Sequence, residues 1–430
     1  MNIQTPVIGF AGMTHLGINS AVATAERGFK VICFDTNAQI IAQLKKWEPS
    51  IIEPQLPDLL RKNKEQFIFT DNPQELLKCD LVYISCDVPT DDQGHSELSS
   101  ITGLINLVYK HLNPTAALVV LCQVPPGFTR RLSVPKDRLY YQVETLIFGQ
   151  AIERALHPER FIVGSQNPEL PLHAAYQVLL AAFQCPIFPM RYESAELAKI
   201  SINCCLVASL SVANTLSELC ERIGADWSEI VPALKLDKRI GAFSYLKPGL
   251  GIAGGNLERD LRTVLELSSQ QGTETGVVNA WIRNSHYRRD WALRALHQVL
   301  GTSKIGQPCI GILGLAYKEN THSTKNSPAL ALLESLIGFY KIKAYDPVVP
   351  AGALPDPMQH CVVESLETAI QDVDVLILMT PWSEFQKLSF KVLRGLMRGS
   401  WIIDPYQVLD GRQAQVAGFK YLSLGVEALC

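Results

Sequence analysis

The stretch Val7-Ile-Gly-Phe-Ala-Gly-Met-Thr-His-Leu-Gly17 decides the fold. Its first five residues are apolar or small and predict a buried strand. Glycines follow at once, a helical pattern runs through Ala21 to Glu26, and a second apolar run from Phe29 to Phe34 ends in Asp35. This spacing is typical of a strand–helix–strand unit that holds a pyrophosphate at the helix N-terminus and a ribose against an acid.

The glycine turn departs from the usual pattern at one position. Thr14 replaces the second glycine, so either the loop shifts slightly or the threonine hydroxyl itself contacts phosphate. Asp35 would repel a 2′-phosphate, which favours NAD over NADP. The alternative is a nucleotide fold that no longer binds a nucleotide. The predicted cofactor-binding residues of this unit are Gly12, Thr14, Leu16, Gly17 and Asp35.

The bulk composition sets limits on the class of protein. A chain of 430 residues is too long for one core, and an apolar fraction of 47% can fill several. The formal net charge of -3 argues against nucleic acid or an anionic membrane as the main partner. No targeting segment or membrane-spanning run is recognised, so we expect a cytoplasmic protein without membrane insertion.

The eleven cysteines are scattered, without the spacing of a metal site or a disulfide framework. We therefore expect no metal. Four of them lie in apolar, strand-like runs and are predicted to be small core residues: Cys33, Cys86, Cys122 and Cys309.

A second glycine cluster lies in the run Lys247-Pro-Gly-Leu-Gly-Ile-Ala-Gly-Gly-Asn-Leu-Glu-Arg-Asp260. Four of the seven residues from Gly249 to Gly255 are glycine, which excludes a stable helix or strand interior. Such a cluster lets the backbone approach a ligand or another segment closely. The alternative is a flexible surface loop.

Between the two glycine clusters, residues 194–222 form a proline-free segment with apolar residues at helical spacing. Lys199 and Asn203 are four residues apart and share one helix face, which fits either a functional pair or a solvated face. A further helix is predicted over 279–300. A second set of alternating elements follows, with strands near 310–313, 342–346, 374–379 and 401–404 and a helix beginning at Ser327-Pro328.

Taken together, these motifs resemble the UDP-glucose/GDP-mannose dehydrogenase family. The glycine run is similar to that family's Gly-Phe-Gly-Gly-Ser-Cys-Phe-Pro-Lys-Asp, and Lys199 and Asn203 fit its Glu-x-x-Lys-x-x-x-Asn. Asp237-Lys-Arg-Ile-Gly241 and Tyr345-Asp-Pro347 match two further segments. The resemblance implies an α/β protein with an NAD-binding Rossmann domain at 1–190, a central helical dimerisation region at 191–300, and a second Rossmann-like domain that binds a nucleotide sugar at 301–430.

The resemblance also implies roles for individual residues. The catalytic candidates are Lys199, Asn203, Asp260, Glu144 and Asn256. Further cofactor contacts are implied at Pro89, Thr90, Gln123 and Lys325. Substrate contacts are implied at Phe148, Arg239, Tyr245, Gly251, Gly254 and Lys318, with Arg239 reaching the neighbouring subunit of a homodimer.

The departures from the family pattern collect at ligand-facing positions. Asn256 stands where the family has its nucleophilic cysteine, and a carboxamide is not a nucleophile. Cys204 and Cys205 follow Asn203 directly and are expected to be packing residues. Gln123, Lys325 and Tyr406 are also altered, and Phe148 replaces an acid, which suits a deoxy or acylated sugar.

The prediction is therefore an NAD-dependent oxidoreductase that acts on a CH–OH group of a nucleotide sugar in polysaccharide or glycoconjugate synthesis. Three outcomes stay open: one hydride transfer that ends at the carbonyl, direct oxidation of a hydrated aldehyde with help from Glu144, or binding without turnover. A hydroxyacid dehydrogenase with the same Lys-x-x-x-Asn pair is a further alternative, because such enzymes transfer a single hydride without a cysteine.

Overall fold

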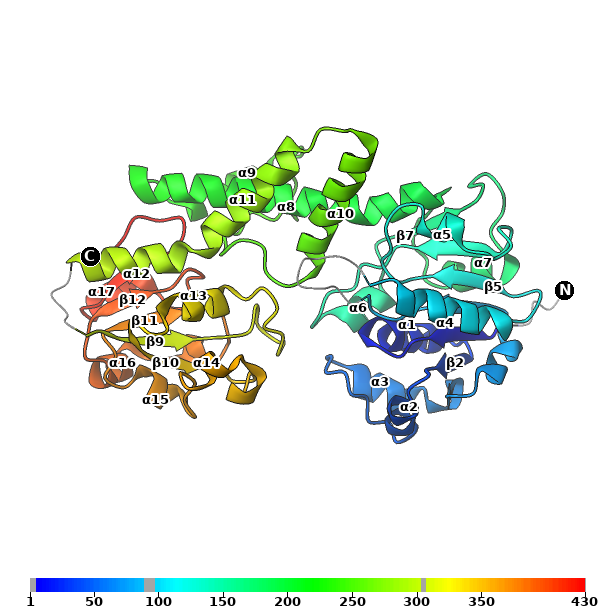
Figure 1. The fold of residues 1–430 in the computed structure, drawn as a ribbon, viewed down its shortest axis with the longest axis horizontal. Helices are drawn as coiled ribbons and strands as arrows, with labels where there is room; N and C mark the ends of the chain where they lie inside the picture. Colours follow the sequence, from blue (N-terminus) through cyan, green and yellow to red (C-terminus); the bar gives the residue numbers. More distant parts are fainter. Residues whose placement is uncertain (1–4, 89–96, 303–306, 430) are drawn as a thin grey trace. The chain divides into compact units, whose positions relative to one another are not determined.

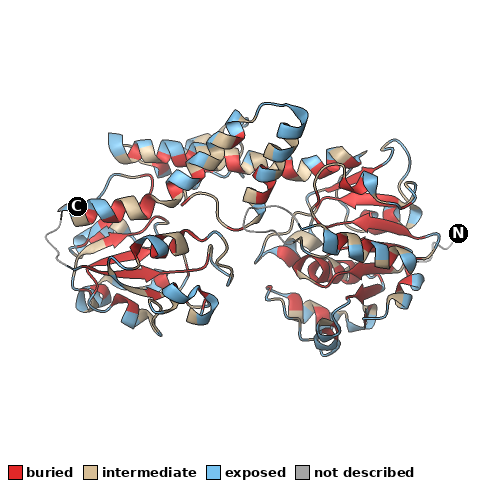
Figure 2. Cartoon of the chain, in the orientation of Figure 1, coloured by how far each residue is buried: buried red, intermediate tan, exposed pale blue. Residues whose placement is uncertain are grey.

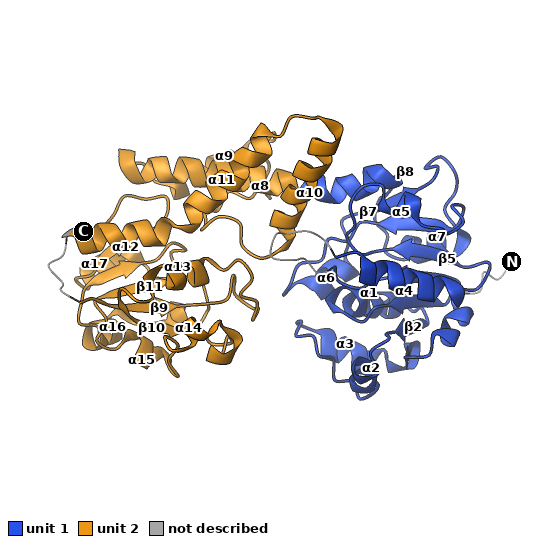
Figure 3. Ribbon diagram, viewed as in Figure 1, with its two compact units in different colours: residues 1–202 blue, residues 203–430 orange. Residues whose placement is uncertain are grey.

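The computed structural model describes residues 5–88, 97–302 and 307–429, and Figure 1 shows their helices and strands. The chain divides into two compact units, Met1–Ile202 and Asn203–Cys430 (Figure 3). Helix α8 (Tyr192–Ile223) begins in the first unit and ends in the second. The division into three domains at residues 190 and 300 stays a prediction.

The first unit is built on an eight-stranded sheet with the order β3-β2-β1-β4-β5-β6-β7-β8. Neighbouring strands are parallel except β6 and β7, which are antiparallel. The central strands are buried on both faces, which explains their unbroken apolar sequence (Figure 2). The strands are β1 (Ile8–Ala11), β2 (Val31–Phe34), β3 (Phe67–Thr70), β4 (Leu81–Ile84), β5 (Ala117–Val120), β6 (Leu139–Gln142), β7 (Phe161–Ser165) and β8 (Ile187–Arg191).

Helices cover this sheet between its strands. The most buried of them is α1 (His15–Glu26), which also packs against α3 and α6 and is therefore rich in small and apolar residues. The strand, turn and helix predicted for residues 7–35 are confirmed. The other helices are α2 (Ala38–Lys45), α3 (Leu56–Lys62), α4 (Ser99–Lys110), α5 (Phe128–Arg131), α6 (Ala151–Leu156) and α7 (Ala174–Ala181), with short 3₁₀ turns η1 (Lys64–Gln66) and η2 (Pro73–Lys78).

The second unit begins with helices. After α8 come α9 (Trp227–Leu236), α10 (Asn256–Gln271), α11 (Gly276–Arg289) and α12 (Trp291–Thr302). The single helix predicted over 279–300 was wrong, because α11 ends at Arg289 and α12 starts two residues later. Asp290 separates them as the C-cap of α11, and its side chain pairs with Arg289 at 2.8 Å. The periodicity of apolar residues does not reveal such a break when apolar residues continue on both sides of it.

A second sheet, with the order β10-β9-β11-β12-β13, completes this unit, and all its neighbouring pairs are parallel. The predicted second Rossmann-like half is thereby confirmed, although the prediction omitted its last strand. The strands are β9 (Cys309–Leu313), β10 (Lys341–Tyr345), β11 (Val375–Leu378), β12 (Trp401–Ile403) and β13 (Lys420–Leu422). The remaining elements are α13 (Pro328–Leu336), α14 (Asp356–Gln359), α15 (Leu366–Ile370), α16 (Phe390–Leu396), α17 (Gly411–Val416), η3 (Ala351–Ala353) and η4 (Phe385–Lys387).

Two expectations about apolar residues need correction. Cys33, Cys122 and Cys309 are buried as predicted, but Cys86 lies beyond the end of β4 and is only half-buried. Among the described residues, α8 is long and apolar enough to cross a membrane by length and composition, with one third of its most apolar window buried. An interior helix of a water-soluble protein also meets this criterion.

Candidate active site

The turn between β1 and α1 is so tight that only glycine fits at two positions. Gly12 has φ +99°, and a Cβ there would lie 2.8 Å from the backbone nitrogen of Cys86. A Cβ on Gly17 would lie 1.9 Å from the carbonyl oxygen of Gly12. Thr14, the N-cap of α1, makes no side-chain bond to the amides of the first helical turn. Burial raises the pKa of the Asp87 carboxyl, and hydrogen bonds from the amides of His15 and Leu16 act in the opposite direction, which shows that an anion is held at this helix N-terminus. A phosphate that replaced this carboxylate would meet the same amides, and the glycine cradle fits the pyrophosphate of NAD.

Asp35, at the end of β2, is fixed to the same turn. Its Oδ2 accepts a hydrogen bond from the Met13 amide at 2.7 Å, and its Oδ1 accepts one from the Asn37 amide at 2.8 Å. The carboxylate thus has a structural task at the strand ends. Its predicted contact with ribose stays a prediction.

The Thr14 side chain joins this turn to the end of β4. Its hydroxyl donates to the Ser85 carbonyl oxygen at 3.3 Å and accepts a hydrogen bond from the Asp87 amide at 3.0 Å. Of the other predicted cofactor residues, Leu16 is buried at 7% exposure and packs in the core. Pro89 and Thr90 lie outside the described residues.

Sequence reasoning missed a buried carboxylate that organises the loop before α6. Glu53 accepts hydrogen bonds from the amides of Gly149 (3.1 Å) and Ala151 (2.8 Å), and it pairs with His15 at 2.9 Å. Phe148 stacks on the His15 ring with centroids 4.0 Å apart. This brings Phe148 beside the first residue of α1. No local sequence signal indicates this role, because the partners of Glu53 lie far away along the chain.

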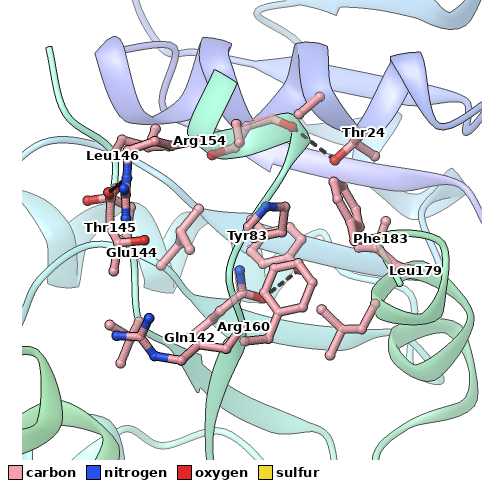
Figure 4. Close-up of a pocket in the computed structure, with 18 of the residues that line it drawn as sticks. Thr24, Tyr83, Gln142, Glu144, Thr145, Leu146, Arg154, Arg160, Leu179 and Phe183 are labelled. Carbon is pink, nitrogen blue, oxygen red and sulfur yellow. Dashed lines mark hydrogen bonds between the residues drawn. The ribbon is translucent and has the colours of Figure 1, made fainter. Parts of the chain in front are cut away.

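Glu144 follows β6 and lines a pocket inside the first unit (Figure 4). Residues of α1, α6 and α7 form the pocket with the facing strands. Gln142 is one of the lining residues, and its Oε1 accepts hydrogen bonds from the hydroxyls of Tyr83 (3.0 Å) and Tyr176 (2.7 Å). The end of β6, from which Glu144 projects, is therefore anchored by a buried polar network.

The turn after β5 is held by a second carboxylate that the predictions did not include. Glu196 of α8 accepts hydrogen bonds from the amides of Gly127 (2.5 Å) and Thr129 (2.8 Å), although burial raises the pKa of its carboxyl. Gln123 precedes this turn and is half-buried. Lys199, also half-buried, lies about one helical turn after Glu196 on α8.

In the second unit, the predicted amide and carboxylate do meet. Asn203 Nδ2 donates to Asp260 Oδ2 at 2.5 Å, and the two residues are 7% and 1% exposed. Arg259 is also buried, and its Nε lies 3.5 Å from Asp260 Oδ1, so its positive charge offsets that of the carboxylate. Lys199 and Asn203 lie one turn apart along α8. That all three predicted groups meet at one substrate carbon stays a prediction.

The glycine run before α10 packs against the chain itself. Gly251 and Gly254 have φ +75° and +77°, and a Cβ on Gly251 would lie 2.3 Å from the carbonyl oxygen of Ser285. The Gly254 amide donates to the Lys325 carbonyl oxygen at 3.1 Å. The flexible-loop alternative is therefore disfavoured, and the close approach expected of these glycines is made to α11 and to the loop that precedes α13.

Asn256 is the first residue of α10 and is exposed. It lies one turn before Asp260, so the two share a helix face. Cys204 is half-buried and packs against Val207 and Leu261, as expected, but Cys205 is exposed and its assignment as a packing residue was wrong. Burial raises the pKa of the Cys204 thiol to about 11.

The remaining substrate candidates fall into two groups. Lys318 and Lys325 are half-buried in the loop between β9 and α13, and Lys318 Nζ lies 5.7 Å from the centre of the Tyr317 ring. Arg239 and Tyr245 are exposed in the segment after α9, where Arg239 pairs with Asp237 at 2.6 Å. The altered Tyr406 is half-buried, and burial raises its pKa to about 12.

A mostly parallel sheet with a glycine cradle that fits NAD, together with a second Rossmann-like half, is typical of a nucleotide-dependent dehydrogenase. Three family models match in chain order: the NAD binding domain (residues 6–179), the central domain (193–286) and the UDP binding domain (311–411) of the UDP-glucose/GDP-mannose dehydrogenase family. The chain belongs to this family. It is accordingly an NAD-dependent enzyme of the nucleotide-sugar dehydrogenase class.

Individual relatives are similar to this chain over nearly its whole length. The chain is 30% identical over 437 residues to the UDP-glucose 6-dehydrogenase TuaD of Bacillus subtilis, which covers 98% of this chain and 94% of that protein. A UDP-glucose dehydrogenase from Pyrobaculum islandicum has a TM-score of 0.82 at 24% identity and covers 96% of each chain. A UDP-D-ManNAc dehydrogenase from Pyrococcus horikoshii has a TM-score of 0.82 at 22% identity, covering 97% of this chain and 99% of that one. These two structures support the fold.

Proposed function

We propose that this enzyme removes a single hydride from a CH–OH group of a nucleotide sugar and releases the carbonyl product. Asn256 carries this proposal. It occupies the first position of α10, one turn before the buried Asp260, where the resemblance calls for a cysteine. The second oxidation in this family needs a sulfur adduct of the aldehyde, and an amide cannot form one.

The neighbouring thiols do not supply a substitute. Cys204 packs in an apolar cluster, and its raised pKa of about 11 keeps the thiol protonated near neutral pH. Cys205 is exposed on α8, about 200° around the helix axis from Asn203. Oxidation through an enzyme-bound thioester therefore has no obvious nucleophile in this part of the chain.

The chain's own polar groups accept the hydroxyl proton of the substrate and stabilise the negative charge that develops on its oxygen. NAD, when bound, accepts the hydride. Lys199 supplies a positive charge for the alkoxide, and Asn203 holds the Asp260 carboxylate in place through the 2.5 Å hydrogen bond. Asp260, directly or through a water, receives the proton. Arg259 keeps this carboxylate oriented and offsets its charge.

The side chain of Phe148 is proposed to influence which sugar is bound. The Phe148 ring stacks on His15 and is 46% exposed, so it offers an apolar surface beside the start of α1. A sugar with a deoxy or acyl group suits that surface better than a fully hydroxylated one, because an apolar wall leaves hydroxyls without partners. UDP-sugars are the first candidates, since TuaD and the P. horikoshii protein bear UDP-sugar names.

The proposal includes a homodimer in the cytoplasm. Val212, Leu216, Leu219 and Ile223 form an exposed apolar stripe along α8, with spacing that keeps them on one face. A second copy of the chain would cover this stripe. The ten cysteines among the described residues are all free, which suits a reducing compartment. Leu216→Asp should yield a monomer in sedimentation velocity, whereas Val416→Asp, at an exposed site on α17, should leave the assembly unchanged.

The deciding experiment measures NADH formed per sugar consumed across UDP-, GDP- and dTDP-sugars. One NADH per sugar supports the proposal, two would show full oxidation despite Asn256, and none would favour a catalytically silent homologue. Lys199→Ala should abolish turnover and leave NAD binding intact, while Lys45→Ala on α2 should change neither. Asn256→Cys should raise the yield toward two, because a thiol at a helix N-terminus ionises readily.

A further inference from the structure

Two cysteines of the first unit lie opposite each other just beyond the ends of neighbouring strands. The β4–β5 ladder ends with Ile84 opposite Val120, and Cys86 and Cys122 each follow two residues later. Side chains alternate along a strand, so this offset keeps both thiols on one face. Neighbouring strands lie about 4.8 Å apart, which falls within the roughly 4.4–6.8 Å between the Cα atoms of a disulfide.

The two thiols differ in access and in acidity. Cys86 is half-buried, whereas Cys122 is fully buried. Hydrogen bonding from the Cys122 thiol lowers the pKa of Cys86, although burial acts in the opposite direction. The same contact, with burial, raises the pKa of Cys122. Cys86 therefore has the character of an attacking thiolate, and Cys122 that of a thiol that reacts second.

Another thiol of this unit provides a contrast. Cys79, just before β4, is fully buried, and burial raises its pKa to about 12. The neighbouring thiol of Cys33 is also fully buried, and burial raises its pKa. Proximity alone thus does not make a reactive pair, because neither of these thiols is accessible to a reagent.

Cys86 also touches the cofactor turn. A Cβ on Gly12 would lie within 2.9 Å of the Cβ, backbone nitrogen and Cα of Cys86. The two backbones are thus in contact without any side chain between them. A shift of Cys86 therefore changes the packing around Gly12, which directly precedes the first turn of α1.

We infer that Cys86 and Cys122 form a reversible thiol-modification site that is oxidised by small-molecule disulfides and weakens NAD binding when bridged. The Cys86 thiolate attacks a disulfide RSSR, forming Cys86–S–S–R and releasing RS⁻. The Cys122 thiol then loses its proton, attacks the Cys86 sulfur and displaces the second RS⁻. One disulfide is reduced to two thiols, and the protein loses two electrons and two protons.

The bridge acts through distance. A disulfide holds its sulfurs at about 2.05 Å, closer than two thiols in van der Waals or hydrogen-bond contact. Closing that gap pulls the segment after β4 toward β5 and away from its contact with Gly12. Within this segment, Asp87 accepts hydrogen bonds from the amides of His15 and Leu16, so the segment and the first turn of α1 are directly linked. Because both adjoin the pyrophosphate cradle, we expect the affinity for NAD to fall by about tenfold or more.

The first test measures the bond itself on the full chain. The protein is equilibrated with oxidised and reduced glutathione, its remaining thiols are alkylated, and its peptides are mapped by mass. A Cys86–Cys122 cross-link that reverses with excess reduced glutathione is expected. Cys122→Ser should retain glutathione on Cys86, and Cys86→Ser should leave Cys122 unmodified. A cross-link elsewhere, or equal labelling of Cys79, would overturn the inference.

The second test measures NAD affinity of the reduced and oxidised forms by calorimetry. The inference rests on the NAD site of the first unit, so the reduced protein and reduced Cys122→Ser must bind NAD. If they do not, the proposed function fails independently of the bridge. The oxidised protein should bind about tenfold more weakly, and Cys361→Ser, a half-buried control, should respond like the unaltered protein. Equal affinity in both redox forms would refute the inference.

Discussion

The two sheets of this enzyme begin alike and then diverge. In each, a glycine with positive φ follows the first strand, Gly12 at +99° and Gly314 at +96°, and a Cβ on either would strike the end of an adjacent strand. In each, an aspartate after the next strand receives hydrogen bonds from the turn: Asp35 from Met13, and Asp346 from Leu315 and Ala316 at 2.7 and 3.0 Å. The glycine turn and its aspartate therefore serve backbone packing in both sheets, and their presence alone does not specify a ligand.

The two halves differ in the segment directly after this glycine. After Gly12 the chain enters α1 at His15, so a helix N-terminus lies at the turn. After Gly314 the chain continues as a loop, and α13 starts only at Pro328. That loop instead holds the glycine run through Lys325 and Asn326. The first half can therefore receive a pyrophosphate at a helix, whereas the second uses the same turn to position another protein segment.

The largest effect is expected at Gly17, which has no counterpart in the second half. Gly17→Ala places a Cβ 1.9 Å from the Gly12 carbonyl oxygen, so the protein should lose about 3 kcal/mol of unfolding free energy or fail to fold. Gly103→Ala, in α4 with nothing nearby, should gain about 0.5–1 kcal/mol. Urea unfolding measures both. Similar stabilities for the two variants would mean that α1 does not approach the turn this closely.

The aspartates provide a test of shared structure against cofactor binding. Asp346 also accepts hydrogen bonds from the amides of Val348 and Val349 and from the Trp382 indole. Losing more hydrogen bonds costs more stability, so Asp346→Ala should lose about 2 kcal/mol of unfolding free energy and Asp35→Ala about 1. If Asp35 also meets ribose, Asp35→Asn should weaken NAD binding about tenfold, while Asp346→Asn should not.

Calorimetric titration with NAD distinguishes the two roles. Equal NAD affinity in both asparagine variants would assign Asp35 the same purely structural task as Asp346. Unfolding measurements on the same samples show whether any loss of affinity follows from a loss of structure.

The smallest effect concerns pH, and it should be alike in the two units. Burial raises the pKa of Glu196 above its ordinary 4.5 and that of Asp404 above 3.8. The folded state therefore binds these protons more tightly, and stability falls as pH rises from the ordinary pKa toward the raised one. Glu196→Gln and Asp404→Asn should each flatten that slope, by at most about 1.4 kcal/mol per pH unit.

Glu26 serves as the control of opposite sign. Its hydrogen bond with Lys62 lowers its pKa, so its contribution is present above the ordinary value and is lost as pH falls. Unfolding free energies between pH 4 and pH 7 compare Glu196→Gln, Asp404→Asn and the control Glu26→Gln. A steeper slope in Glu196→Gln would contradict the assignment of burial as the dominant cause.

The fold was largely predictable because its signals are local. Strands buried on both faces appear as apolar runs, and the residues from Val7 to Asp35 combine such runs with turn glycines and an acid. The Asn203–Asp260 contact was also anticipated, but only through the resemblance, since 57 residues separate the partners. No local pattern encodes that distance.

The supporting carboxylates could not be found from sequence. Glu53 and Glu196 are ordinary charged residues until the fold buries them against the amides of Gly149 and Gly127. Asp290 likewise gives no sign that one helical pattern contains two helices. Roles that depend on long-range hydrogen bonds or on a change of helix axis emerge only in three dimensions.

The run from Gly249 to Gly255 has the composition of a flap that opens and closes over a substrate. Its amides are committed elsewhere, Ile252 to the Ser285 hydroxyl at 2.7 Å and Gly254 to Lys325. We expect these two amides to exchange slowly with deuterium, unlike those of a swinging gate. The glycines here allow protein segments to approach one another closely. Because the run is held in place, Asn256, which follows it, has a fixed position.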